Sequence, residues 1–175
     1  MIISLTGFMG CGKSCIGRIL SEKLGYRLID LDAWIEKSDG RSVRRIFSED
    51  GEAGFRKMET ATLKSVVEEA GDENIVLSLG GGTLTTPEAA GIVHSMTACI
   101  YLKAGIGTLV NNLTRWPGDR PMLGDHPDSA ALRSRIEELM SQRARTYEHT
   151  AHIIMEIDGR EYSDVAEDII RQCVR

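Results

Sequence analysis

Aromatic residues and excess positive charge are both scarce in this chain. Of its 175 residues only 5% are aromatic, whereas 42% are hydrophobic, and the formal net charge is -5. This length and apolar content suit one compact domain with a buried core. The acidic balance argues against the broad basic surface that tight binding to nucleic acid or to an anionic membrane requires. We therefore expect neither as a partner, and any anion site must be a local cluster.

Paired cysteines and long apolar runs are also lacking. The four cysteines, Cys11, Cys15, Cys99 and Cys173, show no C-x-x-C spacing, which favours free thiols in a reducing compartment over a disulfide framework. The apolar start at residues 1–3 is too short for a signal peptide or a membrane span. These absences predict a cytoplasmic protein. The four histidines make no convincing metal set.

Short apolar runs alternate with segments of helical periodicity along the chain. Strands are expected at residues 2–6, 27–31, 75–79, 98–102 and 152–157,. Helices are expected at about 13–24, at 33–71 with an interruption near Gly51 and Gly54, at 87–94 and at 106–113,. Two further helices are expected, one that ends at about 147 and one that begins at 162. The alternation predicts an α/β fold of three layers, with a five-stranded parallel sheet flanked by helices. No repeat or linker divides the chain, so we expect a single domain over residues 1–175.

One segment, residues 114–127, differs from the rest in composition. It is rich in Pro, Gly, Asp and Arg and has little apolar periodicity. We expect a mobile loop there, of the kind that closes over a reaction site as a lid.

The segment Gly7-Phe8-Met9-Gly10-Cys11-Gly12-Lys13-Ser14 matches the phosphate-binding pattern G-x-x-x-x-G-K-S/T in full,. It lies between a predicted strand and a predicted helix, as that motif requires. The glycines let backbone N–H groups converge on phosphate oxygens, and the helix adds its positive N-terminal end. We expect Lys13 at the β- and γ-phosphates and the Ser14 hydroxyl on Mg²⁺. The alternative is a glycine-rich turn with an exposed lysine.

Two carboxylates, Asp30 and Asp32, follow the second predicted strand at the sheet edge where α/β proteins bind ligands,. In an extended segment the two side chains would point the same way, so that one could hold the metal while the other meets an acceptor hydroxyl. No carboxylate follows the third predicted strand, and Asp30 is therefore our candidate metal ligand. The alternative for Asp32 is a helix N-cap, which would not exclude a catalytic role.

Several arginines and a run of glycines complete the set of candidates. Arg56 and Glu59 are one helical turn apart and can pair, although taken alone such a pair is more typical of a solvated surface. Gly80-Gly81-Gly82 offers backbone donors after the third strand, or a plain tight turn. Phosphoryl transfer needs cations beyond the loop lysine. Arg120, in the predicted lid, and Arg143, one turn before Tyr147, are candidates for that role.

Together these motifs resemble the shikimate kinase family, small members of the P-loop kinases related to nucleoside monophosphate kinases. The residues that carry the resemblance are Gly7 to Ser14, Asp30-Leu31-Asp32, Phe55-Arg56-Lys57-Met58-Glu59, Gly80-Gly81-Gly82, Arg120-Pro121-Met122-Leu123 and Arg143-x-x-x-Tyr147. Their order and spacing span nearly the whole chain. The resemblance implies one kinase domain, with substrate-binding helices at about 32–60 and a lid at about 114–127.

The resemblance also implies a role for individual residues. Asp32 would be the base at the 3-hydroxyl of shikimate, and Arg56 and Arg143 would bind the shikimate carboxylate. The glycines Gly80, Gly81 and Gly82 would add substrate contacts, and Phe47 and Phe55 would line the ring. ATP would contact the lid residue Arg120, Arg115 and Arg160 near the adenine, and six residues of the loop: Gly10, Cys11, Gly12, Lys13, Ser14 and Cys15. Lys13 and Arg120 would also be catalytic. Mg²⁺ would be held by Ser14 and Asp30, and a monomer is expected.

Two features depart from the family pattern. Met122 stands where leucine is usual, a change that preserves apolar volume, and Trp116-Pro117-Gly118 is unusual in the lid. Two alternatives stay open. A related small-molecule kinase, such as a gluconate kinase, would share the phosphate loop and the lid, and a nucleotide-binding switch would use ATP only to order its lid.

Overall fold

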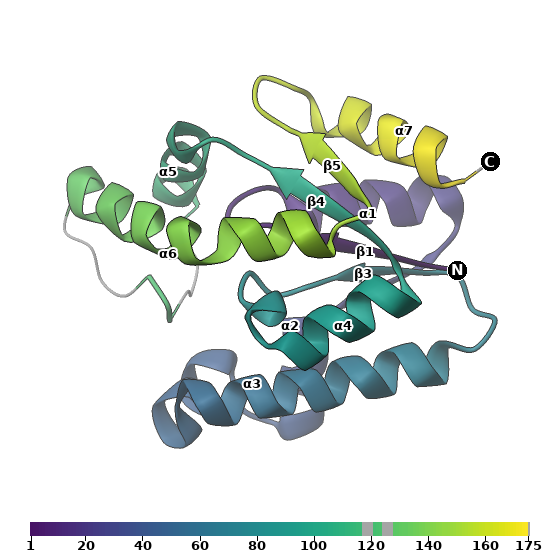
Figure 1. The fold of residues 1–175 in the computed structure, drawn as a ribbon, viewed down its shortest axis with the longest axis horizontal. Helices are drawn as coiled ribbons and strands as arrows, with labels where there is room; N and C mark the ends of the chain where they lie inside the picture. Colours follow the sequence, from purple (N-terminus) through teal and green to yellow (C-terminus); the bar gives the residue numbers. More distant parts are fainter. Residues whose placement is uncertain (117–120, 124–127, 175) are drawn as a thin grey trace.

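Five parallel strands form the centre of the molecule (Figure 1). The computed structural model describes residues 1–116, 121–123 and 128–174. The strands are β1 (Ile2–Thr6), β2 (Arg27–Asp30), β3 (Ile75–Ser78), β4 (Ala98–Lys103) and β5 (Ile153–Glu156). Their order across the sheet is β2-β3-β1-β4-β5, and every neighbouring pair is parallel. The predicted five-stranded parallel sheet is therefore confirmed.

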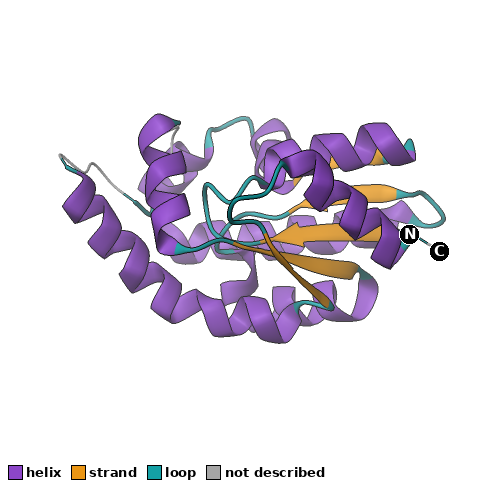
Figure 2. Ribbon diagram, turned by 90° about the horizontal axis from the view of Figure 1, so that it is seen from above, coloured by secondary structure: helices purple, strands orange, loops and turns teal. Residues whose placement is uncertain are grey.

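Helices cover both faces of this sheet and give the predicted three layers (Figure 2). They are α1 (Lys13–Leu24), α2 (Leu31–Asp39), α3 (Val43–Ala70), α4 (Pro87–Met96), α5 (Ile106–Arg115), α6 (Ser129–Thr150) and α7 (Tyr162–Cys173), with a short 3₁₀ helix, η1 (Thr83–Thr85). Helix α1 packs beside α7, whereas α4 packs against α3 and α6 on the other side. In the described part of the chain no helix is long and apolar enough to cross a membrane.

The central strands are apolar because both of their faces are covered. Ile3 and Leu5 of β1 are fully buried, and all four residues of β3 are buried. Continuous apolar runs of this kind are typical of parallel strands between two layers of helices. At the sheet edges, by contrast, Leu28 of β2 and Ile154 of β5 are exposed. Because β2, β3 and β1 are parallel neighbours, their carboxyl ends come together at one edge of the sheet.

The predicted helix at 33–71 is in fact two helices. Helix α2 ends at Gly40, which has a left-handed φ of 86°, and Ser42 caps α3 by accepting a hydrogen bond from the backbone N–H of Arg45. The interruption near Gly51 is confirmed, since its φ of 74° and ψ of 175° produce a kink within α3. Gly54, however, is helical.

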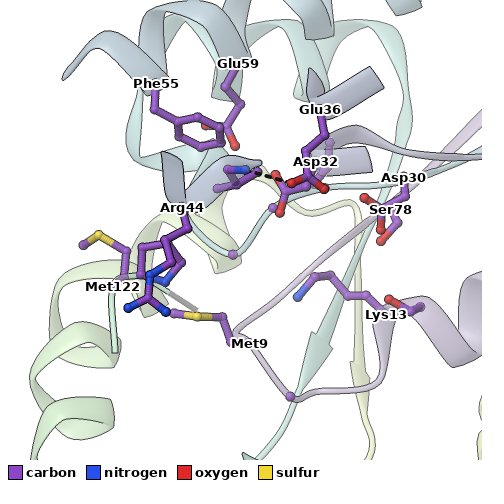
Figure 3. A pocket seen from close by; sticks show the side chains of 18 of the residues that line it. Met9, Lys13, Asp30, Asp32, Glu36, Arg44, Phe55, Glu59, Ser78 and Met122 are labelled. Atoms are coloured by element: carbon purple, nitrogen blue, oxygen red, sulfur yellow. Dashed lines mark hydrogen bonds between the residues drawn. The ribbon is translucent and has the colours of Figure 1, made fainter. Parts of the chain in front are cut away.

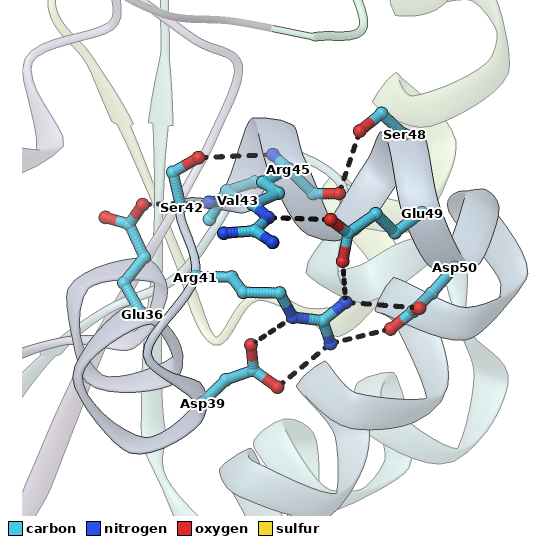
Figure 4. A network of polar contacts seen from close by, with 9 residues as sticks. All are labelled: Glu36, Asp39, Arg41, Ser42, Val43, Arg45, Ser48, Glu49 and Asp50. Carbon is cyan, nitrogen blue, oxygen red and sulfur yellow. Dashed lines mark hydrogen bonds and ion pairs between the residues drawn. The ribbon is translucent and has the colours of Figure 1, made fainter.

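A polar network ties the start of α3 to the end of α2 (Figure 4). The guanidinium of Arg41 pairs with carboxylates of Asp39, Glu49 and Asp50 at 2.6–2.8 Å. The carboxylate of Glu36 accepts a hydrogen bond of 2.8 Å from the backbone N–H of Val43. Single surface ion pairs contribute little, but this network joins both ends of a three-residue connection and fixes the direction in which α3 begins.

The expectation for the second strand was wrong in one respect. Strand β2 ends at Asp30, and Asp32 lies in the first turn of α2 instead of in extended chain. The helix cap is Asp30, whose carboxylate accepts a 2.9 Å hydrogen bond from the backbone N–H of Ala33. The two carboxylates therefore reach the sheet edge from a strand end and from a helix.

Much of the predicted lid lies outside the described residues, including Arg120, Pro117 and Gly118. Its first two residues, Thr114 and Arg115, are instead the end of α5.

Candidate active site

A pocket of about 700 Å³ opens at the carboxyl ends of β1, β2 and β3 (Figure 3). Its walls are the loop between β1 and α1, α2 as far as Glu36, α3 as far as Glu59, the glycines after β3, the segment 121–122, and residues of α5, α6 and α7. The residues that were predicted as site residues and line it are Gly10, Gly12, Lys13, Ser14, Cys15, Asp30, Asp32, Arg56, Gly80, Gly81, Gly82 and Arg143. Ligands bind at this edge of open parallel sheets.

The loop from Gly7 to Ser14 has a backbone that requires glycine. Gly10 and Gly12 have φ values of 82° and 93°, in the left-handed region,. A Cβ on Gly12 would also lie only 2.7 Å from the ring of Tyr162. Helix α1 begins directly afterwards at Lys13, so the positive end of its dipole is directed at the loop. The loop is thus a ready anion site at the floor of the pocket.

Lys13 is turned back onto this loop. Its ammonium donates hydrogen bonds of 2.8 Å to the Gly7 carbonyl and 3.0 Å to the Phe8 carbonyl. Ser14 and Cys15 are exposed in the first turn of α1. Cys11, by contrast, has a fully buried side chain, so it can offer only its backbone to a ligand.

Asn112 and Tyr162 hold the loop from outside, and neither was singled out from the sequence. The Asn112 side-chain amide donates a 2.8 Å hydrogen bond to the Gly10 carbonyl, and the Tyr162 ring packs on Gly12. Both line the pocket. No local signal marks them, because each comes from a helix about 100 residues or more away from the loop.

Side-chain oxygens that could share a metal ion lie where β2 and β3 end. Asp30 faces Ser78 in the parallel register, and Ser78 is buried and lines the pocket beside Ser14 and Asp30. Among the described residues no group of three His, Cys, Asp or Glu side chains could hold a metal ion alone. A few protein oxygens that share a cation with phosphates and water are what Mg²⁺ prefers, so the donor set fits that ion.

Asp32 is a partly buried carboxylate that lines the pocket. Burial raises its pKa from the ordinary 3.8 to about 6, and the negative charges of Glu59 and Asp30 add to the shift, which Lys13 and Arg56 partly oppose. Its buried Oδ1 atom has no hydrogen-bond partner among the described residues. A carboxylate oxygen that is desolvated and unpaired is prepared to accept a proton or a hydroxyl hydrogen bond from a ligand.

Arg56 lies inside the pocket, so the alternative of a solvated surface pair is wrong. Its guanidinium donates a 2.9 Å hydrogen bond to Glu59, which is only 1% exposed. The guanidinium also lies 5.8 Å from the ring centre of Phe47 and 5.4 Å from that of Phe55. These contacts fix its plane.

Arg143 is the second arginine in the pocket and is more deeply buried, at 3% exposure. Its Nη1 atom has no hydrogen-bond partner among the described residues. The guanidinium lies 5.8 Å from the ring centre of Phe8. One turn later on α6, the Tyr147 hydroxyl donates a hydrogen bond to the Gly81 carbonyl. A buried cation that forms no ion pair with a described residue is costly,, which indicates that an anion belongs beside it.

The glycines after β3 permit close approach of these side chains. A Cβ on Gly80 would lie 3.0 Å from Oδ1 of Asp32, and one on Gly82 would collide with the guanidinium of Arg56. These glycines form more than a plain tight turn, because any other residue would displace the charged groups.

Two predicted adenine contacts, Arg115 and Arg160, do not line this pocket. The guanidinium of Arg115 lies 5.2 Å from the ring centre of the exposed Trp116. Arg160 is held in an ion pair with Asp168. The predicted lid arginine, Arg120, lies outside the described residues.

Further residues line the pocket that sequence reasoning passed over, among them Met9, Glu36, Val43, Arg44, Asn112 and Tyr162. Arg44 comes from the first turn of α3 and, in Figure 3, extends towards Met9 and Met122 at the pocket mouth. An arginine in the first turn of a helix, followed directly by Arg45, carries no sequence signal of such a position.

A phosphate loop on a doubly covered parallel sheet, in one pocket with a partly buried carboxylate and two arginines, defines a P-loop kinase that acts on a small anionic acceptor. A family model described as shikimate kinase matches residues 9–174. The chain belongs to the shikimate kinase family and is an ATP-dependent phosphotransferase.

Similar known proteins support the same family assignment. It is 39% identical to the shikimate kinase of Chlorobium phaeobacteroides over 99% of this chain and 91% of the relative. It is also 39% identical to that of Thermus thermophilus, over 99% and 90%. A solved structure of shikimate kinase from Acinetobacter baumannii in complex with shikimate has a TM-score of 0.89 at 29% identity, and the match covers 98% of this chain and 91% of that one. Nothing in these comparisons favours a gluconate kinase.

Proposed function

We propose that the chain transfers the γ-phosphate of ATP to the 3-hydroxyl of shikimate, giving shikimate 3-phosphate and ADP. The observation that carries the proposal is that one pocket holds two arginines, the partly buried Arg56 and the buried Arg143, together with the partly buried carboxylate of Asp32, opposite the phosphate loop. Shikimate is a small ring that carries one carboxylate and three hydroxyls, so it offers an anion to the arginines and a hydroxyl to Asp32.

The acceptor would bind through its carboxylate. Arg56 is held in a fixed plane by Glu59 and the phenylalanine rings, and Arg143 has a donor that no described protein group uses. Two converging guanidinium groups bind a carboxylate through charge-assisted hydrogen bonds. The ring of the acceptor would then lie between Phe55 and Gly81, with a hydroxyl directed at Asp32.

Asp32 would accept the proton of the attacking hydroxyl. With a pKa of about 6 it is still mostly ionised at neutral pH, and it is a stronger base than an exposed aspartate,. Lys13 would leave the loop carbonyls for the β- and γ-phosphates, and the loop amides of residues 10–15 would bind the phosphates,. The rate enhancement would come mainly from positioning and from stabilisation of charge.

Magnesium fits the oxygens of Ser14 and Asp30, with Ser78 beside them, and would neutralise the phosphates of ATP when bound with it. On the resemblance we also assign Arg120 to the transferring phosphate, as a lid arginine that excludes water. The same resemblance supports the adenine contacts of Arg115 and Arg160, although in this structure neither lines the pocket. We further propose one kinase domain over residues 1–175, acting as a cytoplasmic monomer.

A substrate panel tests the proposal. ADP release is followed in a coupled assay with Mg²⁺ and ATP, and with shikimate, gluconate, quinate or water as acceptor. Shikimate should support turnover at least about 100-fold above water, a discrimination of about 3 kcal/mol that binding of one buried carboxylate accounts for. Turnover with gluconate but not shikimate would refute the assignment, and nucleotide binding without turnover on any acceptor would favour a switch.

A further inference from the structure

Thr83 makes a contact that the proposed mechanism does not yet use. It is the first residue of η1 and is fully buried. Its hydroxyl donates a 2.6 Å hydrogen bond to Oε1 of Glu59, and the other carboxylate oxygen of Glu59 accepts the 2.9 Å hydrogen bond from Arg56. The three side chains therefore form one line of hydrogen bonds that starts behind the pocket wall and ends at the guanidinium inside it.

The carboxylate of Glu59 depends on both partners. It is only 1% exposed, and a buried carboxylate is stable only when donors satisfy its oxygens. Arg56 satisfies one oxygen and Thr83 the other. Removal of the hydroxyl would leave Oε1 of Glu59 buried without this donor, and the carboxylate would rotate to share the guanidinium with both oxygens.

A rotation of the Glu59 carboxylate would also affect Asp32, because both side chains lie close to Gly80. A Cβ on Gly80 would lie 2.9 Å from Oε1 of Glu59, 3.0 Å from Oδ1 of Asp32 and 3.1 Å from Oγ1 of Thr83. Three oxygen atoms thus converge on one point of the backbone. Because the Thr83 hydroxyl donates its single proton to Glu59, it cannot also donate to Asp32. Oδ1 of Asp32 therefore stays open to a ligand.

We propose that Thr83 is a positioning residue of the acceptor site, whose hydroxyl fixes the carboxylate of Glu59 and, through it, the guanidinium of Arg56. The proposal rests on the proposed function, because Arg56 is taken to bind the carboxylate of the acceptor. It assigns Thr83 an effect on acceptor binding and none on nucleotide binding, since Thr83 does not line the pocket and its hydrogen bonds run to Glu59 and to the Gly80 carbonyl.

The test is a set of matched substitutions. Thr83→Val keeps the volume of the side chain and removes the hydroxyl, Thr83→Ala removes it without placing a methyl group against Glu59, and Thr83→Ser keeps it. Thr60→Val is the control, because Thr60 is also a buried threonine beside Glu59, but its hydroxyl has no partner among the described residues.

Steady-state kinetics with shikimate and ATP give the readout. Thr83→Val and Thr83→Ala should raise KM for shikimate about 10-fold, in line with the loss of one hydrogen bond to a charged group, with KM for ATP within about twofold of wild type. Thr83→Ser and Thr60→Val should stay within about threefold on both substrates. In an Arg56→Ala background, Thr83→Val should add less than about twofold to KM for shikimate, because the residue through which Thr83 acts is gone.

Three results would overturn the proposal: an unchanged KM for shikimate in both Thr83→Val and Thr83→Ala, a Thr83→Ser variant as impaired as Thr83→Val, or an equal effect of Thr83→Val with and without Arg56. In each of these the wild-type protein still phosphorylates shikimate, so the proposed function stands. A wild-type protein without activity on shikimate would instead overturn both.

Discussion

Arg56 and Glu59, three residues apart on α3, form a 2.9 Å salt bridge inside the pocket, where Glu59 is only 1% exposed. A buried pair of this kind is costly to assemble, and its stability depends on further hydrogen bonds. Thr83 supplies one of these bonds to Glu59. This arrangement lowers the stability of the folded protein but holds the guanidinium of Arg56 in one orientation. A fixed guanidinium is what recognition of a single carboxylate requires.

Arg56→Ala should weaken binding of shikimate far more than binding of nucleotide. Loss of the guanidinium removes charge-assisted hydrogen bonds to the acceptor carboxylate and leaves Glu59 without its ion-pair partner. A cost of about 2–4 kcal/mol corresponds to a 30- to 1,000-fold rise in Kd for shikimate. The Kd of Mg-ADP, measured by calorimetry on the same preparation, should change less than about threefold. Equal losses for the two ligands would count against the assigned role.

Arg143→Met should separate stability from function. The substitution removes a buried cation whose Nη1 has no partner among the described residues, and methionine fills much of the same volume. We expect the free energy of unfolding in urea to rise by about 1–3 kcal/mol, while kcat/KM for shikimate falls at least about 100-fold. A variant that is both less stable and fully active would show that the guanidinium serves packing alone.

Asp32→Asn should stabilise the ligand-free protein in a pH-dependent way. The pKa of Asp32 is raised in the folded state, from 3.8 to about 6, so the stability that its protonated form contributes is present below pH 3.8 and is lost as the pH rises through 6. The neutral amide avoids that loss.

The advantage of Asp32→Asn should therefore grow between pH 4 and pH 7 and level off near 3 kcal/mol at most. Urea unfolding in EDTA at pH 5 and pH 8 measures it. An advantage that is the same at both values would show that Asp32 has an ordinary pKa in the folded protein.

Gly12→Ala should abolish nucleotide binding and spare acceptor binding. Gly12 has a φ of 93°, and a new Cβ would collide with the ring of Tyr162 at 2.7 Å, so the loop must distort. The control is Gly107→Ala in α5, where a Cβ would meet no atom within 4 Å. That control should be fully active and more stable by about 0.5–1 kcal/mol. Intact Mg-ADP binding in Gly12→Ala would mean that the loop tolerates the change.

The parts of the site that could be predicted from sequence are those whose chemistry is local. The phosphate loop occupies eight consecutive residues, and its glycines indicate the positive φ angles that the backbone adopts there. The alternation of apolar runs likewise predicted all five strands. The signal is strongest for β1, β3 and β4, because strands buried on both faces need continuous apolar segments,.

Other parts depend on contacts between distant segments and left no local pattern. Tyr162 packs on Gly12 from 150 residues away, and Thr83 meets Glu59 across the end of the sheet. The placement of Asp32 was wrong for a different reason. Two aspartates separated by one leucine suggest an extended chain, but Asp30 is also a strong N-cap, and the helix it begins takes in Asp32,.

Analysis of the product by phosphorus NMR tests the central claim most directly. Wild-type protein is incubated with Mg²⁺, ATP and shikimate, and the ³¹P signal of the product is correlated with the ring protons. The account predicts a single phosphate monoester coupled to the proton at C3, formed together with one equivalent of ADP. A phosphate ester at another hydroxyl, or ADP formed without any ester, would contradict it.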